Sequence, residues 1–294
     1  MKYPIRKEFQ KYSAVRMPVN PVVLKLANAM MPLGQKGKRL DGALEKRTVG
    51  LSHCKAELIT PKNAQTPPLL IYYHGGAFMM KAAAYHKNLA QTYAKEVGCA
   101  VLFADYRRAP EYKFPLPVED CFEAYRWALE KGFSEILVGG DSAGGNLALA
   151  VLQKAYRAGL PMPKGLLLVY PVADSRMQTE SMKKFIDTPL WNSVLNEKMY
   201  RGYASEGERH DPLLSPMEAE DLSFLPPTYL ETAEYDCLHD EGVALANRLE
   251  KEGVAVTRND TAGTIPGYDI AEKSAYVQEQ VQKRIEFLKN ILKE

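Results

Sequence analysis

The sequence has few of the features that assign a chain to a specialised class of protein. Its 38 Lys and Arg residues nearly balance 36 Asp and Glu residues over 294 positions, which gives a net charge of +2. Nucleic-acid binding needs a basic face, so this balance argues against it. No apolar run approaches 18 residues, so no membrane span is expected. The first 19 residues are charged and interrupted by prolines, unlike a signal peptide. These absences predict a soluble, cytoplasmic protein.

Metal-site and cofactor motifs are also missing. The four cysteines, at positions 54, 99, 121 and 237, have no C-x-x-C spacing, so neither a zinc site nor a dithiol redox pair is indicated. No H-E-x-x-H, P-loop or G-x-G-x-x-G pattern occurs. A chain of this length can bury a large core without disulfides. We therefore expect reduced thiols, no metal and no cofactor.

The pattern of apolar residues indicates an α/β protein. Continuous apolar runs, which are typical of parallel strands covered on both faces, occur at residues 69–73, 100–103, 136–138, 166–170 and 228–230. Helical periodicity occurs at residues 118–130, 146–158, 241–253 and 276–292. Alternating strands and helices predict a mainly parallel sheet flanked by helices.

Two segments do not fit this alternation. Residues 1–45 are helical in pattern and precede the first apolar strand, and residues 175–224 form an insertion too long for an ordinary connection. We interpret the two segments as a helical lid over one end of the sheet. The whole chain, 1–294, is then a single domain.

The first chemical motif is a G-x-S-x-G pattern at residues 140–144, between the strand at 136–138 and the following helix. In that context the serine stands on a sharp strand-to-helix turn and its hydroxyl is exposed at the carboxyl end of the sheet. The helix N-terminus adds positive potential where an oxyanion would form. Ser142 is therefore the candidate nucleophile.

The second motif, His74-Gly75-Gly76-Ala77-Phe78, directly follows the strand at 69–73. Consecutive glycines let backbone N–H groups turn into a pocket, so Gly75 and Gly76 are candidate oxyanion donors together with the N–H of Ala143. We expect His74 to brace this loop by hydrogen bonds rather than to act as a base.

With two further motifs, the chain resembles a known family. Four motifs resemble, in order and spacing, those of the hormone-sensitive-lipase-like branch of the α/β-hydrolases. They are HGGAF, the run DYRRAPE at 105–111 followed by Phe114-Pro115, GDSAGGN, and EYDCLHD at 234–240. The resemblance covers residues 69–268 and implies the α/β-hydrolase fold. It implies Ser142 as nucleophile, Asp236 as triad acid, and Gly75, Gly76 and Ala143 as oxyanion donors. It also implies short-acyl carboxylic esters, which are small molecules, as substrates.

Asp236 is also supported by its own position. It follows the strand at 228–230 by a short loop, which delivers a carboxylate to the same sheet edge as Ser142. The competing explanation is a helix N-cap, a common role for aspartate. Asp240, just before the helix, suits that role better.

The triad histidine is absent. The resemblance places it in a G-x-x-H-G-[FY] context, but residues 263–268 read GTIPGY, with Pro266 at the histidine position, and no histidine follows His239. Proline carries no ionisable group, whereas a serine hydroxyl needs a neighbouring base. His239 lies too near Asp236 to bridge to Ser142. His210 lies in the lid, and we expect His53 and His86 to be surface or packing residues.

Three explanations stay open. The chain is an altered form of an active esterase, a pseudo-hydrolase that binds a ligand in the acyl pocket, or a weak enzyme that uses a water or a displaced base. We favour an ester hydrolase that acts through a Ser142 acyl-enzyme and is impaired by Pro266. The sequence leaves open whether the chain forms a homodimer.

Overall fold

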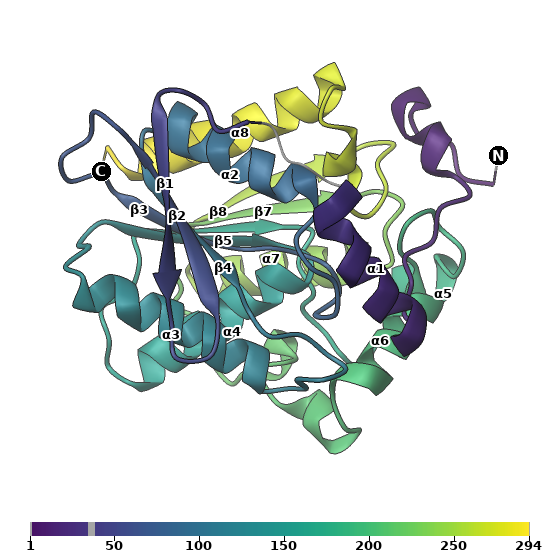
Figure 1. Cartoon of the computed structure of the whole chain (residues 1–294). Helices are drawn as coiled ribbons and strands as arrows, with labels where there is room; N and C mark the ends of the chain where they lie inside the picture. Colours follow the sequence, from purple (N-terminus) through teal and green to yellow (C-terminus); the bar gives the residue numbers. More distant parts are fainter. Residues whose placement is uncertain (1, 35–38, 294) are drawn as a thin grey trace.

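The computed structural model describes residues 2–34 and 39–293. Within that part of the chain, eight strands form one sheet in the order β1-β2-β4-β3-β5-β6-β7-β8 (Figure 1). The strands are β1 (Leu44–Gly50), β2 (Lys55–Pro61), β3 (Leu69–Tyr73), β4 (Ala100–Asp105), β5 (Ile136–Asp141), β6 (Gly165–Val169), β7 (Thr228–Ala233) and β8 (Val256–Thr261). β2 is antiparallel to both its neighbours, and the other pairs are parallel. The predicted mainly parallel sheet is confirmed.

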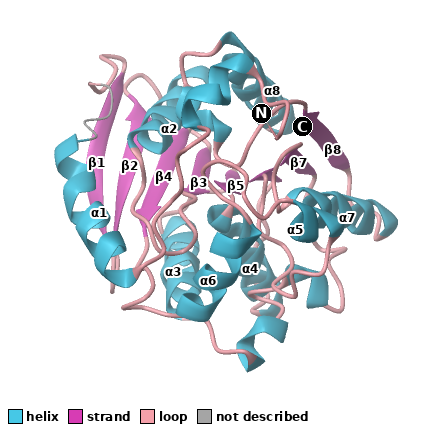
Figure 2. Ribbon diagram, turned by 90° about the vertical axis from the view of Figure 1, so that its right-hand side faces the viewer, coloured by secondary structure: helices cyan, strands magenta, loops and turns pink. Residues whose placement is uncertain are grey.

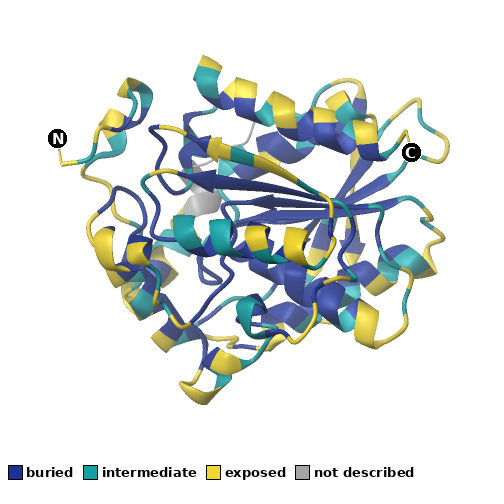
Figure 3. Ribbon diagram, turned by 180° about the vertical axis from the view of Figure 1, so that it is seen from behind, coloured by how far each residue is buried: buried dark blue, intermediate teal, exposed yellow. Residues whose placement is uncertain are grey.

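Helices cover both faces of this sheet. α2 (Ala84–Val97) and α8 (Ala275–Ile291) pack on one face, whereas α3 (Leu116–Glu130), α4 (Ala143–Arg157) and α7 (His239–Lys251) pack on the other (Figure 1). Each face buries its own apolar cluster. Every residue of the central strands β3, β5 and β6 is buried, as the dark ribbon of Figure 3 shows. Their continuous apolar runs follow from this two-sided burial.

Sequence analysis predicts five of the strands, β3 to β7, and the helices α3, α4, α7 and α8 to within three residues at each end. It does not predict β1, β2, β8 or α2. β1 and β8 are the two edges of the sheet; β1 exposes most of its residues and β8 exposes half of them. An edge strand faces solvent, so its sequence is polar and lacks a continuous apolar run. No helix in the described residues is both long enough and apolar enough to cross a membrane.

The two predicted lid segments lie together at one end of the sheet (Figures 1 and 2). Their elements are η1 (Lys7–Tyr12) and α1 (Pro21–Gly34) in the first segment, and α5 (Glu180–Lys184), α6 (Ser193–Tyr203), η2 (Gly207–His210) and η3 (Pro216–Glu218) in the second. Backbone hydrogen bonds join Val15 and Met17 to Leu190, so the segments support each other. The first segment ends before position 45, because β1 begins at Leu44; residues 1 and 35–38 lie outside the described residues.

A buried ionic cluster anchors the chain that follows β8. Arg284 of α8, fully buried, donates to Glu231 of β7 (Nε to Oε2, 3.1 Å) and to Asp269 of η4, residues Tyr268–Ala271 (Nη1 to Oδ1, 2.8 Å). The Tyr170 hydroxyl also donates to Asp269 (2.6 Å). Asp269 stands three residues after Pro266, so this cluster determines where the Pro266 loop lies.

We expect Arg284→Met to lower the free energy of unfolding by about 3–5 kcal/mol, because it leaves two buried carboxylates without their counter-charge. Urea denaturation measures the change. Lys283→Met is the matched control on the same helix, because the side chain of Lys283 is exposed and pairs with Glu279, Gln280 and Asn259 at the surface. Equal losses in the two variants would contradict the assigned role of the buried cluster.

Candidate active site

Ser142 occupies a strained turn between β5 and α4. The strand ends at Asp141 and the helix begins at Ala143, and Ser142 has φ 52° and ψ −118°. A positive φ is unfavourable for a residue with a Cβ atom, so the neighbours must hold it. A Cβ on Gly144 would overlap the carbonyl oxygen of Tyr73, and one on Gly140 would overlap the Gly144 backbone. The strand–turn–helix context predicted from the sequence is confirmed.

The Ser142 side chain borders a cavity of about 80 Å³. Three parts of the chain contribute to its wall: the loop after β3, residues 74–81, which we call the oxyanion loop after its predicted role; the predicted lid; and the loop after β8. The lining residues include Gly76, Ala77, Met80, Lys81, Tyr85 and His86; Met17, Leu190 and Trp191; and Tyr170, Pro266, Gly267 and Ile270. Within the described part of the chain, the Ser142 hydroxyl makes no hydrogen bond.

The Asp141 carboxylate connects the serine turn to the oxyanion loop. Its Oδ1 accepts hydrogen bonds from the Tyr72 hydroxyl and the Gly75 N–H, both at 3.0 Å. Its Oδ2 lies 3.0 Å from Nε2 of His86. Burial disfavours the charged form, but His86 and the Gly75 amide outweigh it and lower the pKa of Asp141. A single buried carboxylate therefore links β3, the loop and α2 beside Ser142.

The structure revises the oxyanion donors. The Gly75 N–H already donates to Asp141, which contradicts the expectation that it faces an oxyanion. A Cβ at Gly75 would overlap Asp141 Oδ2, so this glycine permits a close approach instead. Gly76 (φ 124°) and Ala77 (φ 56°) turn the chain next, and both line the cavity. No backbone hydrogen bond from either N–H occurs among the described residues. Ala77 is therefore a further candidate donor, which the motif by itself does not distinguish from its neighbours.

His74 braces the oxyanion loop, as expected. Its Nδ1 lies 2.6 Å from the Gly75 carbonyl oxygen, and its ring stacks on Tyr106 with centroids 4.6 Å apart. Burial lowers the pKa of His74 to about 3. With this low pKa the ring is a weak base, and although its Nε2 has no hydrogen-bond partner, His74 does not line the Ser142 cavity, so it supports the loop.

Of the two roles expected for His86, the structure shows the packing one: its side chain is buried, and it borders the Ser142 cavity. The Ala83 N–H donates to its Nδ1 at 3.0 Å. The ring proton therefore lies on Nε2, which donates to Asp141. Because both nitrogens are engaged, His86 positions Asp141 and has no free lone pair for the serine proton.

The other histidines are remote from Ser142. His53 is exposed, His210 pairs with Glu218 (3.1 Å), and His239 pairs with Asp240 (2.8 Å). None of the three lines the Ser142 cavity. No histidine in the described part of the chain therefore offers a free base to the serine.

Asp236 is fully buried in the turn between β7 and α7. Its Oδ1 accepts the Leu238 N–H at 2.9 Å, whereas its Oδ2 has no hydrogen-bond partner. Burial raises the pKa of Asp236 to about 7. The helix cap is Leu238, not Asp240 as expected; Asp240 instead accepts the Ser181 N–H. A buried carboxylate oxygen without a partner is rare, so it calls for a functional explanation.

The loop that carries Pro266 lies directly beside the Asp236 turn. The Tyr235 N–H donates to the Thr264 carbonyl oxygen (3.0 Å), and the Gly263 N–H donates to Glu234 (2.7 Å). Pro266 itself borders the Ser142 cavity. The loop therefore runs between the acid and the serine but offers no side-chain donor at position 266.

No group of three or more His, Cys, Asp or Glu side chains in the described residues could hold a metal ion. The four cysteines are free thiols; three are buried, and Cys54 is half-buried.

Comparisons with known proteins agree with this geometry. Residues 70–269 match the family model for the alpha/beta hydrolase fold. The acetyl-hydrolase of Streptomyces hygroscopicus is 36% identical over 213 residues, covering 71% of this chain and 70% of the relative. The esterase LipI of Mycobacterium tuberculosis is 33% identical over 216 residues, covering 71% and 67%. The structure of a bacterial heroin esterase superposes with a TM-score of 0.90 at 30% identity, covering 99% of both chains.

We expect Asp141→Asn to lower the free energy of unfolding by about 1–3 kcal/mol. The asparagine oxygen can accept from Gly75 and Tyr72, but its NH₂ group then faces the N–H of His86. If the His86 proton moves to Nδ1 instead, that N–H faces the N–H of Ala83, so two donors still point at each other. Urea denaturation measures the loss. Asp105→Asn, at an exposed strand end, is the control and should change little.

The raised pKa of Asp236 predicts a pH-dependent stability. Between about pH 4 and pH 7 the folded protein keeps a proton that the unfolded chain has released, so the free energy of unfolding falls as the pH rises through this range. Asp236→Asn lacks this contribution. From pH 5 to pH 7.5 we expect the unaltered chain to lose about 2–4 kcal/mol relative to the variant in urea denaturation. If the free energies of unfolding of the unaltered chain and of Asp236→Asn change equally with pH, Asp236 is ionised throughout this range and the prediction is wrong.

Proposed function

We infer that this chain, which belongs to the α/β hydrolase fold family, is a carboxylic ester hydrolase that acts through a Ser142 acyl-enzyme and is impaired by Pro266. One observation carries this inference. The buried Asp236 has an oxygen without a partner beside the loop of Pro266, while the Ser142 turn keeps its strained geometry. A triad that has lost only its histidine leaves this arrangement.

The chemical steps follow from the groups around Ser142. Its hydroxyl oxygen attacks the ester carbonyl, and the N–H groups of Gly76, Ala77 and Ala143 stabilise the oxyanion. Ala143 is the first residue of α4, so its N–H has no partner within the helix and the helix dipole adds positive potential. Because no triad base is present, solvent water takes the serine proton. The bond between the acyl carbon and the alkoxy oxygen breaks, and the alkoxide takes a proton from solvent and leaves as the alcohol. Water then adds to the acyl-enzyme, which releases the acid and restores the Ser142 hydroxyl.

Pro266 removes the proton acceptor for the first step. Loss of the base in a serine hydrolase lowers turnover by about 10⁶-fold. The oxyanion hole and substrate binding still accelerate the reaction by roughly 10³–10⁴-fold over the reaction in water. The small cavity supports short acyl groups, as does the similarity to an acetyl-hydrolase. Met17, Leu190 and Trp191 border it, which supports a lid role for both segments.

A second candidate, a ligand-binding protein without turnover, is favoured by one observation. Both ring nitrogens of His86 are engaged, and the unpartnered Nε2 of His74 belongs to a residue that does not line the Ser142 cavity. In that case the serine hydroxyl and the oxyanion amides hold a ligand carboxylate instead of a transition state.

Pro266→His separates the two candidates. We expect the unaltered chain to hydrolyse p-nitrophenyl acetate and butyrate near background, and the variant to do so at least 10³-fold faster, because the new imidazole accepts the serine proton and donates to Asp236. Absorbance of released p-nitrophenol measures the rate. The double variant Pro266→His with Ser142→Ala is the control and should return to background.

Reaction of Ser142 with an organophosphonate probe gives a second measurement, followed by intact-protein mass. The Pro266→His variant should be labelled much faster than the unaltered chain. A variant that neither hydrolyses these esters nor reacts with the probe would refute the esterase assignment and leave the ligand-binding candidate.

A further inference from the structure

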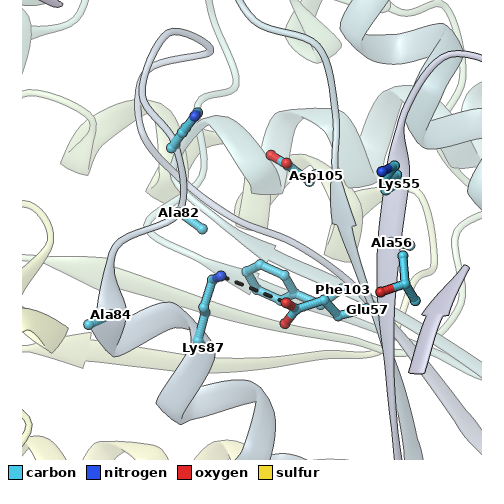
Figure 4. Close-up of a pocket in the computed structure, with 10 residues that line it drawn as sticks. Lys55, Ala56, Glu57, Ala82, Ala84, Lys87, Phe103 and Asp105 are labelled. Carbon is cyan, nitrogen blue, oxygen red and sulfur yellow. Dashed lines mark ion pairs between the residues drawn. The ribbon is translucent and has the colours of Figure 1, made fainter. Parts of the chain in front are cut away.

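Lys81 stands where the Ser142 cavity meets the outer surface. It comes three residues after Phe78, at the end of the oxyanion loop, and it borders the Ser142 cavity. It also borders two outer hollows, of about 280 Å³ and about 480 Å³. The smaller hollow lies between β2, the end of β4 and α2 (Figure 4), and the larger one lies between α1 and residues 105–112. One side chain is therefore shared by the reactive site and both hollows.

The backbone at Lys81 is held in place. Its N–H donates to Oδ1 of Asn28 at 2.9 Å, and the Asn28 amide donates in turn to the Met79 carbonyl oxygen at 2.9 Å. These bonds tie α1 of the lid to the end of the oxyanion loop. The ammonium group is thus carried on a long side chain from a fixed point at the edge of the site.

Three lysines surround the smaller hollow. Lys55 of β2 and Lys87 of α2 approach from opposite sides, with the Phe103 ring between them (Figure 4), and Lys81 is the third. The lining also contains two carboxylates, those of Glu57 and Asp105.

Both carboxylates are already neutralised. Glu57 pairs with Lys46 at 3.3 Å and with Lys87 at 3.8 Å, and Asp105 pairs with Arg108 at 2.6 Å. Within the described part of the chain, neither Lys55 nor Lys81 forms an ion pair. The hollow therefore keeps an excess of positive charge, and its two unpaired cations lie on the side shared with the larger hollow.

We propose that Lys81 and Lys55 bind a negatively charged group on the substrate, so that the preferred substrate is a small ester with a carboxylate remote from the scissile bond. This inference rests on the proposed function for the identity of the reacting group. The scissile carbonyl lies at Ser142, and the remainder of the molecule extends past Lys81 into the hollow. An ammonium group attracts a carboxylate as a point charge, and a site open to solvent keeps the attraction sensitive to salt.

Turnover tests the preference in the Pro266→His variant. Monoethyl adipate carries the remote carboxylate, and ethyl adipamate is its neutral amide of the same length. Ethanol release measures kcat/KM for both esters. We expect a ratio of at least about ten in favour of the anion, which falls about threefold to tenfold on adding Lys81→Gln or Lys55→Gln and also falls in 0.5 M NaCl. The ratio cancels any general effect on the oxyanion loop.

Lys164→Gln is the matched control, because Lys164 precedes β6 and lines neither hollow. It should leave the ratio unchanged. The anion site would be refuted if the active Pro266→His variant gave a kcat/KM ratio near one, or if the Lys81 and Lys55 substitutions left the ratio unchanged. Either result would leave the esterase function supported.

Binding to the unaltered chain tests the site without catalysis. Calorimetry compares the monoamide of adipic acid, an anion, with neutral adipamide. We expect the anion to bind more tightly, and Lys81→Gln to remove the difference. This result together with an inactive Pro266→His variant would refute the esterase function but keep the anion site. Equal binding of the two amides would overturn the anion site.

Discussion

The buried carboxylate of Asp141 is the constraint on which the rest of the site depends. It accepts hydrogen bonds from Tyr72, Gly75 and His86, which belong to β3, the oxyanion loop and α2. Asp141 precedes Ser142, so the same residue that ends β5 also sets the distance between nucleophile and loop. With the Gly75 amide held by this carboxylate, the next two amides are the ones that turn toward the cavity. A buried charge is costly unless it is hydrogen-bonded, and here both carboxylate oxygens accept hydrogen bonds that join three elements.

A second buried ionic cluster determines the other half of the site. Arg284 holds Asp269, and the loop that carries Pro266 is thereby fixed against the Asp236 turn. Pro266, on a loop that borders the Ser142 cavity and lies beside the Asp236 turn, has a ring with no proton to donate or accept. Strain such as that of Ser142 persists only where surrounding structure enforces it. On the proposed function, this is a catalytic geometry whose base is absent, and the unpartnered oxygen of Asp236 marks where that base would bind.

Predictions from single residues failed where the outcome depends on distant partners. His86 has no motif that distinguishes it from a surface histidine, because its partner Asp141 lies 55 residues away. Gly75 and Gly76 look equivalent in the sequence, but only the first meets Asp141. The polar edge strands β1 and β8 have no apolar run, so only their pairing with β2 and β7 in the sheet identifies them as strands. In each case the missing information is a long-range contact.

The sequence by itself determined the central strands, the longer helices and the serine turn, and it predicts the vacant histidine position. These are local properties: a strand buried on both faces needs a continuous apolar run, and a turn with a positive φ at Ser142 needs small neighbours. Tertiary structure alone decided which amides are free, that His86 belongs to the site, and that one oxygen of Asp236 has no partner. It also brought Lys81 and Lys55 around one hollow beside the reactive site. Those features depend on side chains far apart in the chain, and only the folded packing brings them within hydrogen-bonding or Coulombic reach of one another.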